Sequence, residues 1–387
     1  MKIFFLSEFL KVEGIRHGGN ERAAQVHELL AQCGDVIHVL QYRPRLLSNA
    51  SSALSDRMDV VLRWIPIFLR GLNPSLPASL KRFKSLQGIK FAGLSDYLFS
   101  RMRKSGFGSQ DILVLEAQLV CYYPLVAKAR RRGAKVIIVP QNLDSLAPGY
   151  INPSTGENAL DWFKWEIVKM KSATAAFCIS REEQWLLRLW GIDAYYLPFY
   201  PIKKREEELH SIRAERNNAS KDIFLVMGSA LNSPTRIGMM QLANHLKNND
   251  DWLKSVKIVV VGNGTEKLKE YFGGKAEVLG TVSDEVMIDL WIRSKACLIH
   301  QPPTTGSVTR IVELLIAGIP VIANSNAARS HFGIDGLHVY EDLAEISAGL
   351  LDNLACPLVP TVDENYFERF RSFVAATQTD EASNSMR

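Results

Sequence analysis

"TTGSVTRIVELLIAGIPVIANS", residues 304–325, is the stretch that decides the fold. Apolar residues recur at helical spacing from Ile311 onward, and Gly318 followed by Pro320 ends the helix and begins a short apolar strand. Small polar residues stand in front of the helix. A loop, a helix, a turn and a strand in this order form one unit of a parallel sheet with crossover helices.

The front of this helix predicts an anion-binding site. Its free N–H groups and aligned peptide dipoles favour a phosphate. Arg310 adds a fork-shaped donor, and Glu313, one turn further on, can accept hydrogen bonds from a ribose diol. The plainer interpretation is a capped helix with a surface Arg310–Glu313 pair, and these residues alone leave both open. The residues that would feed the anion site are Thr304, Thr305, Gly306, Ser307 and Val308.

Short apolar runs alternate with longer amphipathic stretches along most of the chain, which indicates an α/β fold with parallel sheets. The alternation occurs twice. The expected strands are 2–6, 36–40, 59–63, 112–116, 135–140 and 175–179 in the first series, and 223–227, 257–262, 276–280, 296–300 and 320–324 in the second.

Two series of this kind predict two Rossmann-like, doubly wound domains that face a central cleft at the carboxyl ends of their strands. The first domain is expected at 1–200 and the second at 221–355. The prolines and dense charges of 201–220 are expected to connect them. Residues 356–387 are expected to form a helix, which packs back toward the first domain, and a polar tail.

Composition sets the class of protein. The chain has 387 residues, of which 47% are hydrophobic, so it can bury sizeable cores. No stretch approaches the apolar length needed to span a bilayer, and the start reads as a first strand rather than a signal peptide. The cysteines are odd in number and lie mostly in apolar runs, as expected for reduced core residues of a cytosolic protein. They are Cys33, Cys121, Cys178, Cys297 and Cys356.

Charge is distributed unevenly. Residues 1–200 carry 26 Lys and Arg against 17 Asp and Glu, whereas the remainder carries 20 against 24. The surplus is moderate and no recognition motif accompanies it, so a nucleic-acid partner is not expected. Residues 65–105 mix aromatic and basic side chains, which favours either docking on an anionic membrane or ordinary solvated helix faces over a core.

Glycines follow several of the expected strands. Gly18 and Gly19 precede an amphipathic helix, where they would allow a ligand close to the backbone, although a tight turn capped by Asn20 explains them as well. Gly228-Ser229 repeats the arrangement in the second domain, and Gly262 and Gly264 follow the next strand. A dinucleotide fingerprint would need a third glycine where Lys267 stands, so a dehydrogenase is not expected.

Taken together, these pieces resemble the glycosyltransferases of GT-B architecture, in particular the large family 4-like group. The first signature, G-G-x-E-R, stands at 18–22. The second, a strand followed by S-x-x-E, stands at Ser180 and Glu183. The strongest match is 277–324, which resembles the region of the family that binds the nucleotide sugar.

The resemblance assigns the opening stretch to the donor. The family pattern is a Glu, seven residues and a second Glu before a small-Gly-x-Pro-Val turn. Glu313 falls on the second Glu, which in the family binds the nucleotide ribose. Thr305 replaces the first Glu, so the carboxylate usually set against the donor sugar is absent.

Two cations of the family pattern are also replaced. The Arg and Lys near the start of the second domain correspond to Ser229 and Pro234. Arg310 and Arg236 are the available substitutes, and the N–H groups of residues 306–308 can share the diphosphate charge. The chain contains no D-x-D motif, so we expect no bound metal and no cofactor beyond the nucleotide sugar, for which a UDP-sugar is the first expectation.

Inverting transfer would also require a base for the acceptor hydroxyl. The usual His-Asn pair of the family stands here as residues 141–142, Gln and Asn, followed by Asp144. Asp144, Glu21 and His17 are the candidates in that order. Each has a structural alternative: Asp144 can cap a turn, Glu21 can pair with Arg22 or Arg16, and His17 can simply border the glycine turn.

The resemblance therefore implies a hexosyltransferase of polysaccharide or glycoconjugate biosynthesis, with a glycan or lipid-linked acceptor. Its expected location is the cytoplasm, including the inner face of the membrane. Two alternatives stay open. One is a nucleotide-sugar epimerase of the same architecture, and the other is a binding subunit that kept the fold and lost turnover.

Overall fold

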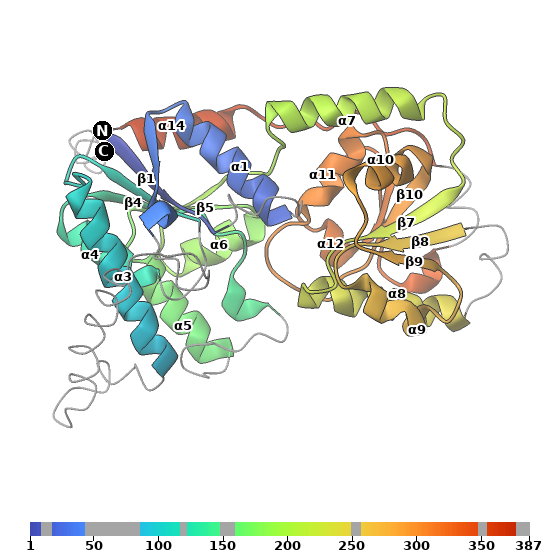
Figure 1. Ribbon diagram of the computed structural model, residues 1–387, viewed down its shortest axis with the longest axis horizontal. Helices are drawn as coiled ribbons and strands as arrows, with labels where there is room; N and C mark the ends of the chain where they lie inside the picture. Colours follow the sequence, from blue (N-terminus) through green and yellow to red (C-terminus); the bar gives the residue numbers. More distant parts are fainter. Residues whose placement is uncertain are drawn as a thin grey trace, which may run out of the picture.

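The structure is a computed structural model, and it describes residues 1–8, 18–42, 86–116, 122–147, 159–248, 257–346 and 354–376. Two parallel sheets of six strands make up the two halves of the molecule, each covered by helices on both faces (Figure 1). The prediction of two doubly wound α/β domains is therefore confirmed.

The first sheet has the strand order β2-β1-β3-β4-β5-β6. Five of its strands match expected ones, and the sixth, β6, was not expected because three residues are too short to show a pattern. The expected strand at 59–63 lies outside the described residues. The strands are β1 Lys2–Leu6, β2 Asp35–His38, β3 Ile112–Leu115, β4 Lys135–Ile138, β5 Ala175–Cys178 and β6 Ala194–Tyr196.

The second sheet has the order β12-β11-β10-β7-β8-β9, in which every pairing is parallel. Only the edge strand β12 was not expected, since its burial is partial and its apolar pattern weak. The strands are β7 Ile223–Met227, β8 Lys257–Val261, β9 Glu277–Gly280, β10 Ser294–Ile299, β11 Val321–Asn324 and β12 Leu337–Tyr340.

Alternate residues of each strand face different helical layers, as the two-residue period of a strand requires. Phe4 packs in the core under α3, α4 and α5, whereas Phe5 packs in the core under α1 and α14. The second sheet is covered by α7, α10 and α11 on one face and by α8 and α9 on the other. The helices are α1 Gly18–Ala31, α3 Leu86–Lys104, α4 Tyr123–Arg131, α5 Ala159–Met170, α6 Arg181–Leu189, α7 Lys203–Arg216, α8 Ser233–Asn248, α9 Lys269–Phe272, α10 Asp284–Arg293, α11 Thr309–Ile316, α12 Ser325–Ala328 and α14 Asn365–Ala375, with short 3-10 helices η1 Val39–Tyr42, η2 Asp144–Leu146, η4 Thr265–Leu268 and η5 Leu343–Glu345.

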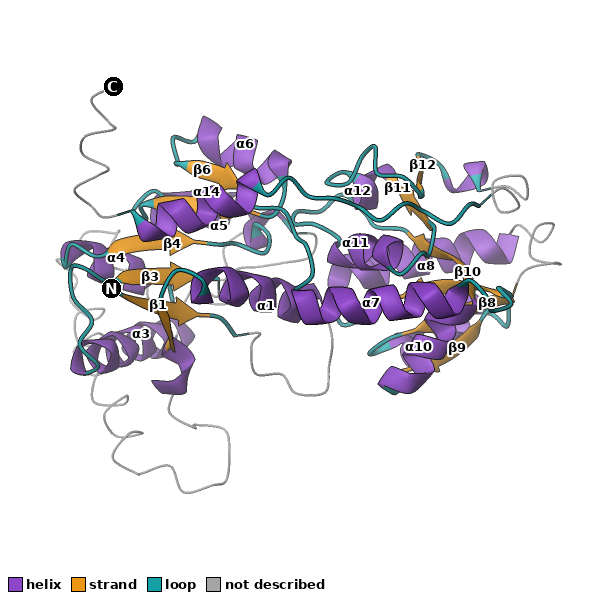
Figure 2. Ribbon diagram, turned by 90° about the horizontal axis from the view of Figure 1, so that it is seen from above, coloured by secondary structure: helices purple, strands orange, loops and turns teal. Residues whose placement is uncertain are grey.

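The chain crosses between the halves twice. After β6 it enters α7, where Leu209 and Ile212 are buried against the second sheet, so the charged segment 201–220 contains a packed helix. It returns through residues 354–364 to α14, which packs on the first sheet (Figure 2). There the ring centroids of Phe177 and Phe370 lie 4.9 Å apart.

Two smaller expectations are corrected. Cys356 is exposed rather than buried, because it lies in the extended segment that returns to the first domain. Asn20 does not cap a turn, because α1 begins at Gly18 and Asn20 lies within its first turn. Cys33, Cys178 and Cys297 are free thiols in or at the cores, and Cys121 lies outside the described residues.

Candidate functional site

The loop before α11 is held at the junction of the two domains. Glu183 Oε1, on α6, accepts a hydrogen bond from Gly306 N at 2.8 Å, and Arg329 donates through Nη2 to Gly306 O. Thr305 Oγ1 donates to Leu143 O at 3.0 Å. Thr305, which stands where the family has a glutamate, thus binds the loop after β4 through its hydroxyl. The carboxylate of Glu183, from the first domain, accepts from the N–H of the next residue.

A buried histidine supports the same loop. Ser307 Oγ and His331 Nε2 lie 2.9 Å apart. Burial, with the nearby charge of Arg329, lowers the pKa of His331 to about 4, so the ring is neutral near pH 7. A neutral imidazole adds no cation here, so His331 positions the loop.

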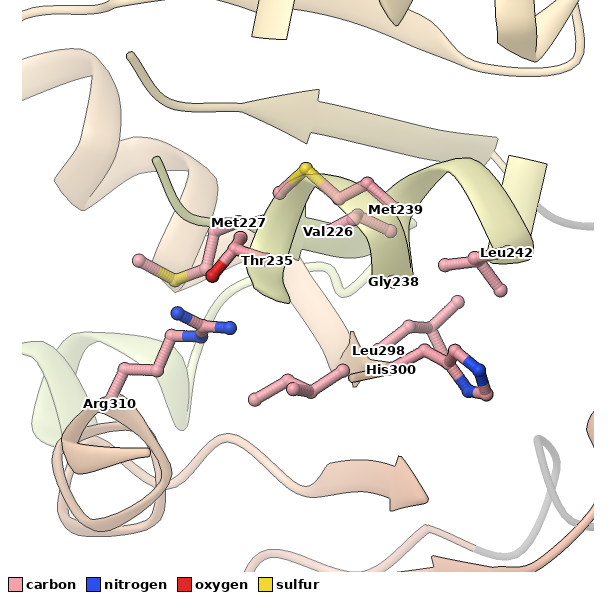
Figure 3. Close-up of a pocket in the computed structure, with 10 residues that line it drawn as sticks. Val226, Met227, Thr235, Gly238, Met239, Leu242, Leu298, His300 and Arg310 are labelled. Atoms are coloured by element: carbon pink, nitrogen blue, oxygen red, sulfur yellow. The ribbon is translucent and has the colours of Figure 1, made fainter. Parts of the chain in front are cut away.

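Arg310 points toward the end of β7 in the second domain. Figure 3 shows its guanidinium directed toward Thr235 and Met227. A Cβ atom built on Gly228 would lie 3.1 Å from Arg310 Nη1, so the end of β7 lies directly against the guanidinium. Its Nε is buried without a hydrogen-bond partner, and burial lowers the pKa of the side chain. A desolvated cation with a free donor at a helix N-terminus can bind an anion.

Glu313 pairs with a residue that the sequence did not indicate. Its Oε1 accepts from Arg205 Nε of α7 at 2.8 Å, and only 7% of the residue is exposed. Burial disfavours the charge of Arg205, but Glu313, Glu208 and the charge of Glu21 of α1 together outweigh this and raise its pKa. The prediction of a surface pair between Arg310 and Glu313 is therefore wrong, because the two side chains leave α11 in different directions.

The N-terminus of α1 faces the N-terminus of α11. A Cβ atom on Gly18 would lie only 2.3 Å from Thr309 Oγ1, so a larger residue would separate the helices. Gly19 O accepts from Gln141 Nε2 at 3.1 Å, which ties α1 to the loop after β4. Two positive helix ends meet at this point, and Figure 1 shows the end of α1 beside α11.

Arg22, the last residue of the G-G-x-E-R motif, is structural. Its exposed fraction is 1%, and it donates to Gln25 Oε1 at 2.6 Å and to Leu197 O at 2.8 Å. Gln25 Nε2 in turn donates to Pro198 O at 2.9 Å. These bonds fix the chain where it leaves β6 for the second domain. Arg22 is used in these bonds, and Arg16, the other expected partner of Glu21, lies outside the described residues.

Three carboxyl groups lie close together at η2: Asp144 of η2 itself, Glu166 and Glu183. Burial raises the pKa of Asp144 to about 7, with a contribution from the charge of Glu183. Burial also raises the pKa of Glu166, which binds the Ser145 hydroxyl, to about 8 and that of Glu183 to about 7. A carboxyl that titrates near neutrality suits proton transfer at physiological pH. Of the three base candidates, Asp144 has this property and Glu21 lies near Arg205, whereas His17 lies outside the described residues.

Another buried carboxyl follows β3. Burial raises the pKa of Glu116 to about 7, against hydrogen bonds from Ser7 and Gln141 and the charge of Arg22. Gln141 Nε2 donates to Glu116 Oε1 at 3.2 Å. The residue that replaces the usual histidine therefore connects this carboxyl with the start of α1.

The remaining candidates surround the ends of β7 and β8. Gly262 packs on Gly228, where a Cβ would lie 2.1 Å from Gly228 O, so packing alone accounts for this glycine. Ser229 Oγ accepts from Leu231 N at 3.3 Å in the same turn. Gly264 caps η4, and Arg236, in the first turn of α8, is exposed.

About half of the basic segment 65–105, residues 65–85, lies outside the described residues. Its described end is in α3, where Leu98 and Met102 are buried in the core and Arg103 and Lys104 are exposed. That end matches solvated helix faces over a core. No helix in the described ranges combines the length and apolar character needed to cross a membrane, and no group of three or more His, Cys, Asp or Glu in those ranges is placed to hold a metal ion.

The sequence did not indicate Arg205, Arg329 or His331, and it indicated Glu183 only as the last residue of the S-x-x-E signature. Arg329 and His331 follow the strand β11, and the carboxyl end of a strand is a signal that could have indicated them. Arg205 offered no signal, because it stands among many equivalent charges in 203–216.

Comparisons with solved structures identify the architecture. The α,α-trehalose 6-phosphate synthase of Burkholderia multivorans is 9% identical with a TM-score of 0.58, over 96% of this chain and 93% of that one. Anabaena HepE in complex with UDP and glucose is 13% identical with a TM-score of 0.56, over 100% and 99%. AviGT4, a glycosyltransferase of avilamycin A biosynthesis, is 14% identical with a TM-score of 0.51, over 100% and 96%.

No protein-family model and no curated protein sequence matches the chain. Sequence identities this low establish the fold alone. The chain therefore has the GT-B fold of these structures, and its near-complete coverage extends the likeness to both domains.

Proposed function

We propose that this protein is a glycosyltransferase that takes its sugar from a nucleotide-sugar donor. The observation that carries the proposal is the meeting of the α1 and α11 N-termini beside Arg310, whose buried Nε has no partner. Two helix ends and a desolvated cation favour the negative charge of a departing nucleoside diphosphate. The motif resemblance to the family 4-like group agrees with this and stays a prediction.

The proposed donor is a UDP-sugar. Among the structural neighbours, HepE was solved in complex with UDP-glucose, and a trehalose-phosphate synthase of Burkholderia xenovorans with glucose-6-phosphate. In our proposal the loop 304–308 and Arg310 receive the diphosphate. Glu313, oriented by Arg205, accepts from the ribose hydroxyls.

In the proposed reaction, Asp144 accepts the proton of the acceptor hydroxyl as that oxygen attacks the anomeric carbon. The bond from this carbon to the diphosphate breaks, and its electron pair leaves with the nucleoside diphosphate. Arg310 and the N-terminus of α11 stabilise the charge that develops on it. Because Asp144 must be ionised to act, its pKa of about 7 predicts a rate that rises with pH through neutrality.

A donor screen tests this function directly. Thermal shift with UDP-, GDP- and dTDP-sugars should identify a donor, because a ligand that binds only the folded state raises Tm. Release of nucleoside diphosphate with glycan or lipid-linked acceptors then reports transfer. Conversion of the donor with no acceptor present would identify an epimerase. Binding without turnover on any acceptor would identify a binding subunit, and no shift with any nucleotide sugar would refute the proposal.

We propose that transfer needs no metal ion, since the chain has no D-x-D motif and offers Arg310 for the same charge. The activity should survive EDTA. Loss of activity in EDTA that magnesium or manganese restores would contradict this proposal.

We also propose a lipid-linked or glycan acceptor and a location in the cytoplasm, at the inner face of the membrane. The support is the basic and aromatic composition of 65–105. The protein should then sediment with anionic vesicles at low salt and be released at high salt, because screening weakens the attraction. Equal recovery in the supernatant with anionic and neutral vesicles would contradict membrane docking.

A further inference from the structure

Glu183 occupies a position that the proposed reaction does not use. It is the third residue after the N-cap of α6, where Ser180 Oγ accepts from Glu183 N at 3.2 Å. A glutamate at this position commonly folds back on its own cap. Here its Oε1 reaches out of the helix and accepts from Leu143 N at 3.2 Å and from Gly306 N at 2.8 Å. One oxygen thus joins a loop of the first domain to a loop of the second.

The backbone of Gly306 is held from both sides. Glu183 accepts from its N–H, and Arg329 donates to its C=O. Since Arg329 follows α12 in the second domain, the two charged side chains approach from opposite domains. The second carboxylate oxygen, Glu183 Oε2, is buried and has no hydrogen-bond partner. Glu183 is only 3% exposed. A buried carboxylate oxygen without a partner lowers stability, which indicates a role beyond packing.

We propose that Glu183 is a positioning residue. Together with Arg329 it clamps the backbone of Gly306 across the domain junction, and it thereby holds the loop before α11 in the conformation that binds the donor diphosphate. This inference rests on the proposed function for its purpose, but the clamp itself is testable without any donor. Glu183 holds the loop through a backbone amide, so its removal should loosen that loop without removing any group that contacts the diphosphate.

The charge of Glu183 tunes the clamp. An ionised carboxylate accepts from an N–H about twice as strongly as a neutral group. The groups that act on Glu183 or feel its charge are Asp144 of η2, Glu166 of α5, Arg22 of α1, Cys178 of β5 and Arg329. Burial raises the pKa of Glu183 to about 7, whereas the hydrogen bond from Gly306 N–H lowers it. Local opening that breaks this bond and leaves Glu183 buried should therefore become less favourable as the pH rises from 6 to 8.

Amide hydrogen exchange of the free protein tests the clamp. In Glu183→Ala, a peptide covering 304–308 should exchange about tenfold faster, the factor that corresponds to a loss of about 1.4 kcal/mol. Glu368→Ala, at an exposed position on α14, is the control and should leave this peptide unchanged. Unchanged protection of 304–308 in Glu183→Ala would overturn the proposal.

The pH dependence separates the clamp from global stability. After correction for intrinsic exchange, protection of 304–308 in the wild type should increase from pH 6 to pH 8, and in Glu183→Gln it should be flat. A purely structural role would give the same pH response in both proteins, and that result would also overturn the proposal. If Glu183→Ala does not fold, Arg329→Met opens the clamp from its other side and should expose the same peptide.

Binding of UDP then tests the purpose of the clamp. Titration calorimetry should show a weaker Kd in Glu183→Ala, about tenfold, and a smaller loss in Glu183→Gln, whose amide oxygen can still accept from Gly306 N. Equal UDP affinity in Glu183→Ala and the wild type would overturn the link to the donor. If the wild type binds no nucleotide, the proposed function fails, and the exchange experiment still decides whether the clamp exists.

Discussion

Apart from Arg22, which binds within the first domain, and Glu313, which pairs with Arg205, the two sides of the domain junction place groups of opposite charge there. The first domain contributes carboxyls, Glu116, Asp144, Glu166 and Glu183, whose pKa values burial raises to about 7 or 8. The second domain contributes Arg310 and Arg329, whose pKa values burial lowers, and the backbone N–H groups of 304–308. Desolvation acts on both sides and pushes both sets toward their neutral forms.

This difference indicates a division of labour. Carboxyls that titrate near pH 7 can take up a proton, whereas guanidinium groups and helix N-termini can stabilise a departing anion. A transfer reaction with a nucleotide leaving group needs one of each on opposite sides of the reacting carbon. The two domains therefore hold complementary parts of the proposed reaction, and neither part is complete alone.

The largest effect should come from the acid side. Asp144→Asn removes the proposed base and should lower kcat by roughly 10²- to 10⁴-fold, the usual contribution of general base catalysis. Initial rates with the donor and acceptor found by the screen measure this, with Tm as the check on folding. Asp161→Asn, an exposed carboxylate on α5, is the matched control. Wild-type kcat in Asp144→Asn would move the base to Glu21 or His17.

On the basic side, Arg310→Ala should lower kcat together with kcat/KM by roughly 10²- to 10³-fold. It removes a donor aimed at charge that develops only as the bond breaks. Arg132→Ala, at an exposed position after α4, controls for the loss of a surface cation. If Arg310→Ala changed KM alone, Arg310 would bind the donor equally in the ground state and the transition state. The basic side would then bind the donor without stabilising the leaving group.

A smaller effect is expected at the ribose. Glu313→Gln should weaken donor binding by about 10- to 100-fold, because a charge-assisted hydrogen bond contributes roughly 1.5–3 kcal/mol. Titration with UDP measures it. Glu208→Gln removes the other partner of Arg205, which binds it at 3.2 Å and is more exposed, so it should leave the affinity for UDP unchanged. Equal affinities in all three proteins would show that Glu313 serves only to pair Arg205.

The smallest effect is on stability. Each of the four carboxyls binds its proton more tightly in the folded protein, so its contribution to the free energy of unfolding is full at low pH and is lost as pH rises through the folded pKa. Buried histidines such as His331, with its pKa of about 4, act in the opposite direction, but only below about pH 6.5. Among the described groups with a shifted pKa, the carboxyls have the main effect between pH 6.5 and 8.5, so Tm should decrease.

Thermal melts across this range measure the decrease, which should be about 2–4 °C for each kcal/mol lost. Glu166→Gln replaces the carboxyl with the highest of these pKa values and should give a shallower slope than the wild type. Equal slopes of Tm against pH in the two proteins would show that burial does not raise the pKa of Glu166 into this range.

The regular elements were largely predictable. Ten of the described strands were expected from apolar runs alone, because a strand buried on both faces is a continuous apolar run in the sequence. Strands β6 and β12 were missed, since each is a short edge strand with partial burial. The helix at 309–316 was predicted with its start near the small polar loop, because Gly318 and Pro320 mark its end.

The candidate site was predictable only in part. Local spacing indicated Arg310, Glu313 and the loop before them, since the anion site of a helix start belongs to one continuous segment. Spacing also suggested that Arg310 and Glu313 pair, and this was wrong because Arg205, more than one hundred residues earlier, lies closer to Glu313. Local spacing carries no information about a partner from another helix.

By itself, the sequence determined which segments form strands and helices, that they build two parallel sheets, and where one helix start can receive an anion. Only the tertiary structure decided that Glu183 reaches Gly306, that Gly18 lies against Thr309, and that Asp144 titrates near neutrality. The reason is physical. Secondary structure follows from periodicity within a few residues, whereas desolvation and contacts across a domain junction depend on which distant surfaces exclude water from one another.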